Sequence, residues 1–163
     1  MIPKTKEGLE KAYDKCQKRY IKIDKISYKD YFEEALSDLA AADKEDIDKW
    51  KIAKAYQALF LHCNGLLVKH AGFYSKDHGC VLIGLIEHKI ISEGILKRIH
   101  TILEEKKKTE VPIKEDLFNE ITRIRIARNK YLYFPKTLRK LKASPKGIIE
   151  EIREIIQILS DEE

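Results

Sequence analysis

The segment RIARNKYLYFP, residues 125–135, carries the side chains best suited to chemistry. When it is projected as a helix at about 100° per residue, Arg128 falls in the middle of an apolar stripe. An arginine keeps its charge, so this position is costly unless a carboxylate or another anion faces the guanidinium. The polar Asn129 follows at once. The stripe itself consists of Leu117, Ile121, Ile124 and Leu132.

The position of Arg128 allows two interpretations. In the first, the side chain forms a salt bridge between helices or between subunits, with Glu34, Asp38 or Glu120 as its partner. In the second, it binds a phosphate group, and a two-fold dimer would bring two copies of it to one groove.

The place of Tyr133 depends on how this helix ends. On a regular helix Tyr133 lies about 140° from Arg128, so the two share a groove only if the helix bends before Pro135. Otherwise the ring packs against the protein and the hydroxyl reaches the surface. Asn129 lies beside Arg125 on this helix and could order that side chain.

Positive charge gathers within residues 123–146, where no acidic residue occurs. With Tyr131 and Tyr133 interleaved, the pattern suits RNA, because cations neutralise phosphates and aromatic rings stack on bases. The alternative is the solvated surface of a lysine-rich protein. The cluster consists of Arg123, Arg125, Arg128, Lys130, Lys136, Arg139, Lys140, Lys142 and Lys146.

Several other kinds of site lack their motifs. The five histidines form no HxxxH or HExxH pair, so we expect no metal site and no cofactor. The stretch GCVLIG, residues 79–84, lacks the lysine of a phosphate-binding loop, and no GxSxG motif occurs. His78 lies just before this stretch, where it would cap a helix or line a groove.

Length and composition indicate one cytoplasmic domain. A chain of 163 residues suits a single domain, and its net charge of +5 is mildly basic. The longest apolar run, residues 80–86, is too short for a bilayer, and we see no signal peptide. The three cysteines lie on apolar stripes, where we expect free thiols that pack in a reducing cytoplasm. Abundant Lys, Glu and Ile with few Asn and Gln are typical of thermophile proteins.

The spacing of apolar residues is helical along the whole chain, so we expect an all-α fold, an antiparallel bundle of five to seven helices. The helix at 44–70 is rich in apolar and small residues, which predicts a central position. Ser27 is a candidate N-cap, Gly72 a candidate helix end, and Ser75 or Asp77 a candidate start of the next helix. The expected helices cover residues 9–23, 28–42, 44–70, 80–91, 95–105, 113–134 and 147–160, with a loop at 71–79 and no strand.

Three stretches resemble the HEPN domain, a helical module associated with nucleotides and RNA. KWKIAKAYQALFLHCNGLLVKHAGFYSKDHG, residues 49–79, resembles its alanine- and tyrosine-rich central helix and the following loop with Ser75 and His78. YFEEALSDLAAA, residues 31–42, resembles its first core helix. RIARNKYLY, residues 125–133, resembles its Arg-polar-x-x-x-His signature.

The resemblance covers residues 28–135 of a single HEPN-like domain that would span 1–163. Residues 1–25 then form an N-terminal helical extension, and residues 147–160 form a C-terminal amphipathic helix.

The family signature is incomplete in this chain, because Tyr133 stands where the histidine is expected. Members with the full motif are metal-independent ribonucleases that act as dimers, with two motifs facing across a cleft. The resemblance gives Arg128 the task of holding the scissile phosphate and Asn129 that of orienting it. A tyrosine is a poor general base at neutral pH, although it can donate a hydrogen bond or stack on a base. The resemblance therefore implies RNA or nucleotide binding more strongly than cleavage.

We thus expect a homodimer that binds RNA or a nucleotide through Arg125, Arg128, Lys130, Tyr131 and His78. Such chains resemble one half of a toxin–antitoxin or defence pair, whose other half is a small nucleotidyltransferase. Two alternatives remain open. One is a metal-independent ribonuclease that uses Arg128 and Asn129, with Tyr133 or His78 in place of the missing base. The other is a protein–protein interaction module in which Arg128 forms a salt bridge and nothing binds nucleotide.

Overall fold

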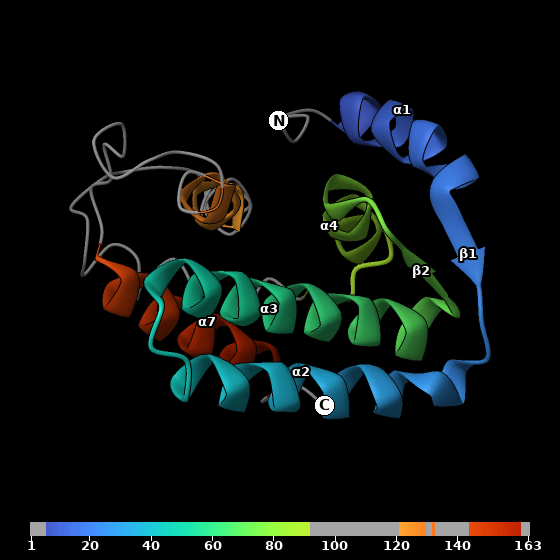
Figure 1. Ribbon diagram of the computed structural model, residues 1–163. Coiled ribbons are helices and arrows are strands. Elements are labelled where there is room, and N and C mark those ends of the chain that lie inside the picture. The colour runs from blue at the N-terminus through green and yellow to red at the C-terminus, as the bar shows by residue number, and fades with distance from the viewer. Residues whose placement is uncertain (1–5, 92–120, 130–131, 133–143, 161–163) are drawn as a thin grey trace.

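The structure is a computed structural model, which describes residues 6–91, 121–129, 132 and 144–160. Over these residues the chain is an all-α bundle with one small sheet, which confirms the expected fold class (Figure 1). The helices are α1 (Lys6–Cys16), α2 (Tyr28–Asp43), α3 (Asp48–Ala71), α4 (His78–Glu87), a helical stretch at 121–129, and α7 (Pro145–Ser160). Two 3-10 turns, Gln17–Arg19 and Lys25–Ser27, and two strands, β1 (Tyr20–Lys22) and β2 (Phe73–Ser75), join them. None of the described helices is long and apolar enough to cross a bilayer. The expected helix at 95–105 lies outside the described residues.

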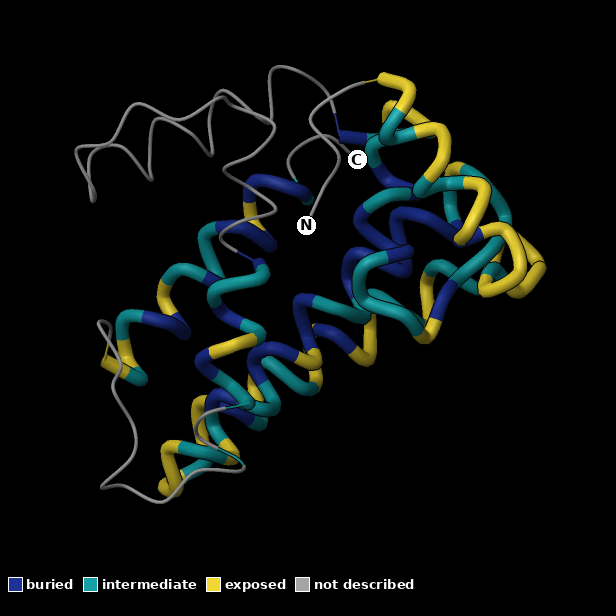
Figure 2. Tube along the Cα trace, turned by 90° about the horizontal axis from the view of Figure 1, so that it is seen from above, coloured by how far each residue is buried: buried dark blue, intermediate teal, exposed yellow. Residues whose placement is uncertain are grey.

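α3 is the centre of the bundle, as its composition predicts. α2 runs antiparallel along one side of it, while α7 and α4 pack on other sides (Figure 1). Ile52 and Leu67 of α3 and Ile152 of α7 are completely buried, and the buried segments lie where the helices face one another (Figure 2). Ile124 of the 121–129 stretch belongs to the same core. This core therefore fixes the faces that α4 and the 121–129 stretch present.

Gly65 allows α2 to approach α3 closely. A Cβ atom at this position would lie 2.5 Å from Cε1 of Phe32 and 3.2 Å from Cβ of Tyr31. The ring of Phe32 instead stacks on His62, with 4.8 Å between the ring centroids. His62 is only 5% exposed, and burial lowers its pKa to about 4.

The expected helix at 9–23 is wrong beyond Cys16, and the loop expected at 71–79 contains a strand. After the 3-10 turn, β1 pairs antiparallel with β2, so that Tyr20 faces Ser75 and Lys22 faces Phe73. Three residues are too few for the alternation that identifies a strand in a sequence. The apolar spacing continues across the break because Tyr20 packs against the core and beside Phe73.

Gly72 and Asp77 are confirmed as helix boundaries, whereas the helix expected at 44–70 begins only at Asp48 and the helix expected at 80–91 ends at Glu87. Gly72 closes α3 with φ 76°, a left-handed conformation that glycine adopts without a steric penalty, and its amide donates to the Val68 carbonyl at 2.9 Å. The Asp77 carboxylate caps α4, accepting from the amides of Gly79 at 2.9 Å and Cys80 at 3.1 Å. Ser27 does precede α2, but its side chain makes no capping hydrogen bond.

The prediction of three free thiols is wrong for two cysteines. Cys16, the last residue of α1, forms a disulfide with Cys80 in the first turn of α4. Cys63 is free and buried, and burial raises its pKa to about 12, so it stays a thiol. The pairing was hidden in the sequence because 64 positions separate the two cysteines. It also removes the cysteine-based reason for a reducing compartment.

Candidate functional site

A buried asparagine sets the position of His78. Asn64 of α3 is 2% exposed, and its amide donates to the Ser75 carbonyl at 3.1 Å and accepts from the Ser75 amide at 3.0 Å. The Ser75 hydroxyl in turn accepts from the Asp77 amide at 3.1 Å. Because Asp77 is the N-cap of α4, this chain of contacts fixes His78 as the first residue of that helix.

His78 packs between two aromatic residues of α3. Its Nδ1 forms a hydrogen bond with the Tyr56 hydroxyl at 2.8 Å, and the Phe60 ring centroid lies 4.0 Å from that of the imidazole. Burial lowers the pKa of His78, and the charges of Arg128 and Arg125 lower it further. The imidazole is therefore neutral at neutral pH, with Tyr56 holding one of its nitrogens.

Tyr56 links the histidine to the arginines. It is 2% exposed, and burial raises the pKa of its hydroxyl, although the charges of Arg125 and Arg128 act in the opposite direction. The Arg128 guanidinium carbon lies 5.4 Å from the Tyr56 ring centroid, within the range of a cation–π contact. Tyr56 of α3 thus contacts both His78 and Arg128.

Arg128 lies at the edge of the buried face of its helix, rather than in the middle as predicted. Ile124 is 0% and Ala127 3% exposed, while Arg128 is half-buried. The sequence projection gave no weight to Ala127, whose small side chain occupies the centre of the stripe. Arg128 is therefore a partly accessible cation beside the core.

The intramolecular ion pairs considered for Arg128 are not formed by the residues that the structure describes. In the described part of the chain Arg128 forms no ion pair with Glu34 or Asp38, and Glu120 lies outside that part. Burial raises the pKa of Asp38, with the Glu34 charge acting in the same direction and Lys54 opposing them. The Arg128 side chain instead donates from Nη1 to Oδ1 of Asn129 at 2.8 Å. Asn129 thus orders the side chain of Arg128, whereas the sequence suggested that it orders the side chain of Arg125.

The surface beside these residues has two adjoining small hollows. Tyr56, His78, Leu82 and Ile121 line both of them. The first reaches the buried side chains of Leu59, Cys63 and Val81 beside the half-buried Phe60, and the second is bordered by Gly79, Thr122 and Arg125. The rings of Phe60 and His78 are the partly exposed aromatic groups here, and they lie next to the positive charge of Arg125.

Only part of the predicted basic cluster can be placed. Arg123 pairs with Glu151, and Lys146 lies 3.9 Å from Glu150 in an exposed i,i+4 pair. Within the described parts of the chain, no carboxylate pairs with Arg125 or Arg128. The remaining five residues of the cluster, Lys130, Lys136, Arg139, Lys140 and Lys142, lie outside the described residues, as do Tyr131 and Tyr133.

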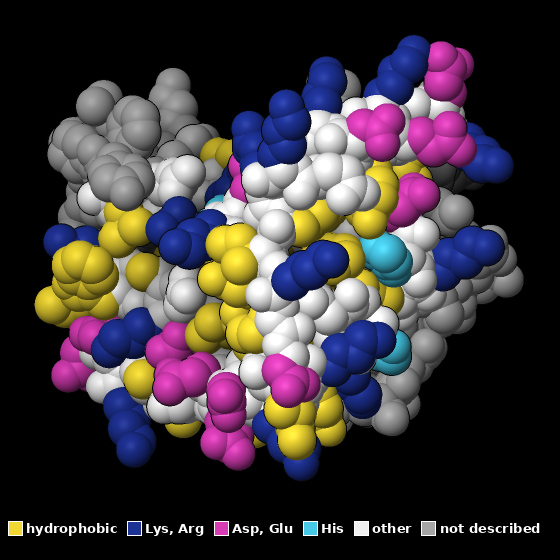
Figure 3. Space-filling model, turned by 90° about the vertical axis from the view of Figure 1, so that its right-hand side faces the viewer, with side chains coloured by type: hydrophobic (Ala, Val, Ile, Leu, Met, Phe, Trp, Pro, Cys, Tyr) yellow, Lys and Arg dark blue, Asp and Glu magenta, His cyan; other side chains and the backbone are white. Residues whose placement is uncertain are grey.

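The face at the β1 end of the molecule differs from this site. Figure 3 shows that face, where Lys and Arg side chains alternate with Asp and Glu and no single sign of charge dominates. Arg19 of this region pairs with Asp77, for example. A mixed surface of this kind attracts phosphate weakly, so the arginines beside Tyr56 are the better candidate for anion binding.

Tyr56 and Phe60 are the functional candidates that the sequence interpretation missed. Both were assigned to the apolar or family-like part of α3. A signal for Tyr56 was present, since a buried tyrosine hydroxyl needs a polar partner, and His78 is the residue that supplies it. Over the described residues, no group of three or more His, Cys, Asp or Glu side chains could hold a metal ion.

Comparison with known proteins gives no relative from which a role could be transferred: no family model, no curated protein and no solved structure matches the chain.

Proposed function

We propose that the protein binds RNA or a nucleotide at the surface formed by His78, Arg125 and Arg128 over the buried ring of Tyr56. The arginines contact phosphate, and the half-buried rings of Phe60 and His78 beside them accept a base. One observation carries the proposal. Arg128 is half-buried and rests on Tyr56, and its only hydrogen bond within the described structure goes to the neutral Asn129. Its charge is therefore uncompensated there, and a phosphate would answer it.

The test is the binding of a fluorescent single-stranded RNA in chelating buffer at moderate salt. We expect Arg128→Ala to raise the Kd at least fivefold, which corresponds to about 1 kcal/mol. Arg153→Ala is the matched control, because it removes the same charge from an exposed ion pair with Asp43 on α2. Equal affinities for both variants and the parent would reject the site.

Cleavage is a second candidate function, and the place of His78 favours it. The neutral imidazole lies beside the proposed phosphate contacts, so it could accept the proton of a ribose 2′-hydroxyl as that oxygen attacks phosphorus. The bond to the 5′-oxygen then breaks, and that oxygen takes up a proton. Such a reaction needs no metal and leaves a cyclic 2′,3′-phosphate. Tyr133 remains an alternative base that lies outside the described residues.

Product analysis separates cleavage from binding. If RNA is cut in chelator to cyclic phosphate ends, and His78→Gln binds RNA but does not cut it, the chain is a ribonuclease. Saturable binding while the RNA stays intact would support binding without cleavage.

The proposed partners rest mainly on the resemblance to HEPN domains. A homodimer is also supported by Ile126, an apolar residue that is 48% exposed between the two arginines in sequence. Light scattering at several concentrations tests the dimer, and Ile126→Asp should make it dissociate. A small nucleotidyltransferase as the other half of a toxin–antitoxin or defence pair, and a cytoplasmic location, likewise remain proposals.

A further inference from the structure

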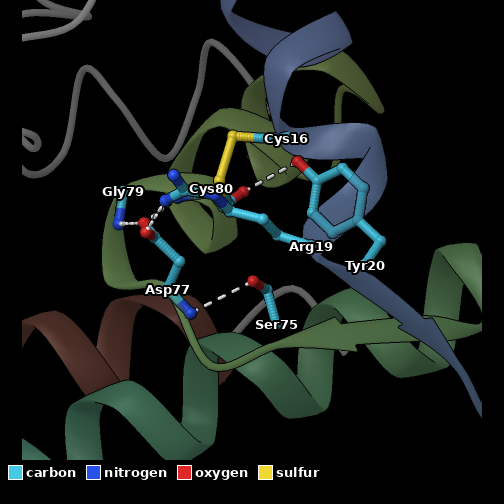
Figure 4. Close-up of a disulfide and its surroundings, with 7 residues drawn as sticks. All are labelled: Cys16, Arg19, Tyr20, Ser75, Asp77, Gly79 and Cys80. Atoms are coloured by element: carbon cyan, nitrogen blue, oxygen red, sulfur yellow. Dashed lines mark hydrogen bonds and ion pairs between the residues drawn. A yellow bond between two sulfur atoms is a disulfide. The ribbon is translucent and has the colours of Figure 1, made fainter.

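The disulfide lies directly beside the proposed site. Cys80 follows His78 by two residues, and its Cα lies 5.4 Å from that of Cys16 at the end of α1 (Figure 4). Both cysteines are buried, at 5% and 3% exposure. The first turn of α4, which carries His78, is therefore covalently tied to a segment far away in the sequence.

Three further contacts join the same two segments. Arg19 forms an ion pair with Asp77, the N-cap of α4, and the Tyr20 hydroxyl donates to the Cys80 carbonyl at 2.8 Å (Figure 4). Tyr20 also pairs with Ser75 in the sheet. We call residues 16–22, which make these contacts, the clasp. The clasp thus contacts Asp77 and Cys80, which precede and follow His78 in the sequence.

The N-cap carboxylate shows how closely the clasp is coupled to the first turn of α4. Burial alone would raise the pKa of Asp77, but hydrogen bonds from the amides of Cys80 and Gly79 and the charge of Arg19 lower it overall. The same carboxylate thus serves the helix start and the clasp at once. If the clasp moves away, the Asp77 carboxylate loses its ion pair with Arg19.

Within the described residues, α1 contributes little to the hydrophobic core. Cys16 is its only buried residue, and none of its residues belongs to the main hydrophobic core. Its contacts are mainly with α4, where Tyr13 forms an exposed hydrogen bond with His88 at 2.8 Å. An isolated helix of 11 residues is marginal in water, so α1 depends on its attachment.

We infer that the Cys16–Cys80 disulfide is a redox control of the site: its reduction releases α1, weakens the attachment of the clasp and loosens the first turn of α4, with His78. The anchor from Asn64 to Ser75 stays in place, so the loosening is local. Because the control acts on the surface where we propose RNA binding, its effect on RNA affinity rests on that proposed function.

The reductant is a dithiol. Its thiolate attacks one cysteine sulfur, the bond between the two cysteines breaks, and a mixed disulfide forms. The second thiol of the reductant then displaces the cysteine. The dithiol is oxidised to a disulfide by two electrons, and Cys16 and Cys80 each end as a protonated thiol. Since both cysteines are buried, attack requires α1 to move away first. A ligand that binds only while His78 is held in place lowers the population of the open form, so it should slow reduction.

Hydrogen exchange on the full chain, oxidised and after dithiothreitol treatment, tests the loosening without any ligand. Thiol titration first verifies the states: one thiol, Cys63, before treatment and three after it. We expect at least tenfold faster exchange after reduction in residues 8–22 and 76–82, with unchanged protection in the middle of α3 and in α7. The Cys16→Ala/Cys80→Ala double variant is the matched control. It should show the faster exchange at once and no response to dithiothreitol.

Unchanged exchange after reduction would overturn the inference, whatever the protein binds. If exchange rises locally, the Kd for single-stranded RNA should rise at least threefold on reduction, and RNA should slow the appearance of thiols. An equal RNA affinity in both states would show that the clasp does not control the site. If the oxidised protein binds no RNA at all, the proposed function fails instead. The local loosening is then decided by hydrogen exchange alone, which does not depend on RNA.

Discussion

Single polar side chains inside this bundle do more than fill space. Asn64 is the hydrogen-bond partner of both the amide and the carbonyl of Ser75, and thereby fixes the loop before His78. Tyr56 provides the hydroxyl for His78 and the ring face for Arg128. Because Asn64 and Tyr56 contact different partners, a substitution of either residue tests its own contacts separately.

Asn64→Ala should destabilise the protein more than its size suggests, because the amide and carbonyl of the buried Ser75 both lose their partner. An unsatisfied buried group costs roughly 1–3 kcal/mol, so we expect a loss of about 2–4 kcal/mol in the free energy of unfolding. Urea titration measures it. Gln57→Ala, which removes an exposed amide from the same helix, is the control and should change stability by less than about 0.5 kcal/mol. Equal losses in the two variants would contradict this role of Asn64.

His62 should make the protein less stable in mild acid. Its pKa is about 4 in the folded protein and about 6.5 when unfolded, so between these values the unfolded chain binds more protons. The stabilisation is fully present above pH 6.5 and is lost as the pH falls towards 4, which amounts to about 2 kcal/mol between pH 7 and pH 5. His62→Gln should lose less stability than the parent over that range. Parallel pH profiles for both proteins would show that His62 is not the cause.

At the scale of the elements, close packing on α3 determines which faces are available for function. α2 approaches one side over Gly65, and α4 and the 121–129 stretch bring His78 and Arg128 to Tyr56 on another. The helix starts and ends at Gly72 and Asp77 give these elements their positions.

Gly65→Ala tests the contact of α2 with α3. The added methyl group would overlap the Phe32 ring, and overpacking typically costs about 1–3 kcal/mol. Gly147→Ala is the matched control. Gly147 lies in the first turn of α7, and a Cβ atom added there would meet only the Ser144 hydroxyl, at 3.3 Å. There alanine should be neutral or stabilising, since it is the better helix former. Thermal unfolding compares the two, and a Gly65→Ala protein as stable as its parent would contradict the packing.

The elements could be predicted from the sequence where many residues share one pattern. The all-α class, the central place of α3, and the roles of Gly72 and Asp77 follow from apolar spacing and capping chemistry. β1 and β2 could not be predicted, because three residues leave no period. The link from Cys16 to Cys80 and the contact of Tyr56 with His78 depend on how elements meet in space, which no local pattern encodes. The buried residue at the middle of the stripe is Ala127 and not Arg128. An alanine occurs in both buried and exposed positions, so its residue type did not reveal this.

At the scale of the whole molecule, charge is balanced except in a few places. A net charge of +5 is spread over 163 residues, and the face in Figure 3 mixes both signs. General electrostatic attraction to RNA is therefore weak, and a particular site must supply the affinity.

The salt dependence of binding distinguishes a particular site from general attraction. If Arg125 and Arg128 each neutralise one phosphate of a single strand, log K should fall with log salt with a slope of about −1.4. Arg128→Ala should reduce the slope to about −0.7, while Arg153→Ala leaves it unchanged. Fluorescence titrations at four salt concentrations measure these slopes. A steeper slope that Arg128→Ala does not change would indicate contacts elsewhere on the basic segments.

The most direct test of the central claim is an NMR titration of the oxidised protein with a short single-stranded RNA, following the ring signals of Tyr56 and His78. We predict that both shift saturably, that Arg153→Ala preserves the shifts, and that Arg128→Ala requires at least fivefold more RNA for half of the change. RNA that binds while these two rings keep their signals, or that moves them equally in both variants, would contradict the assignment of the site.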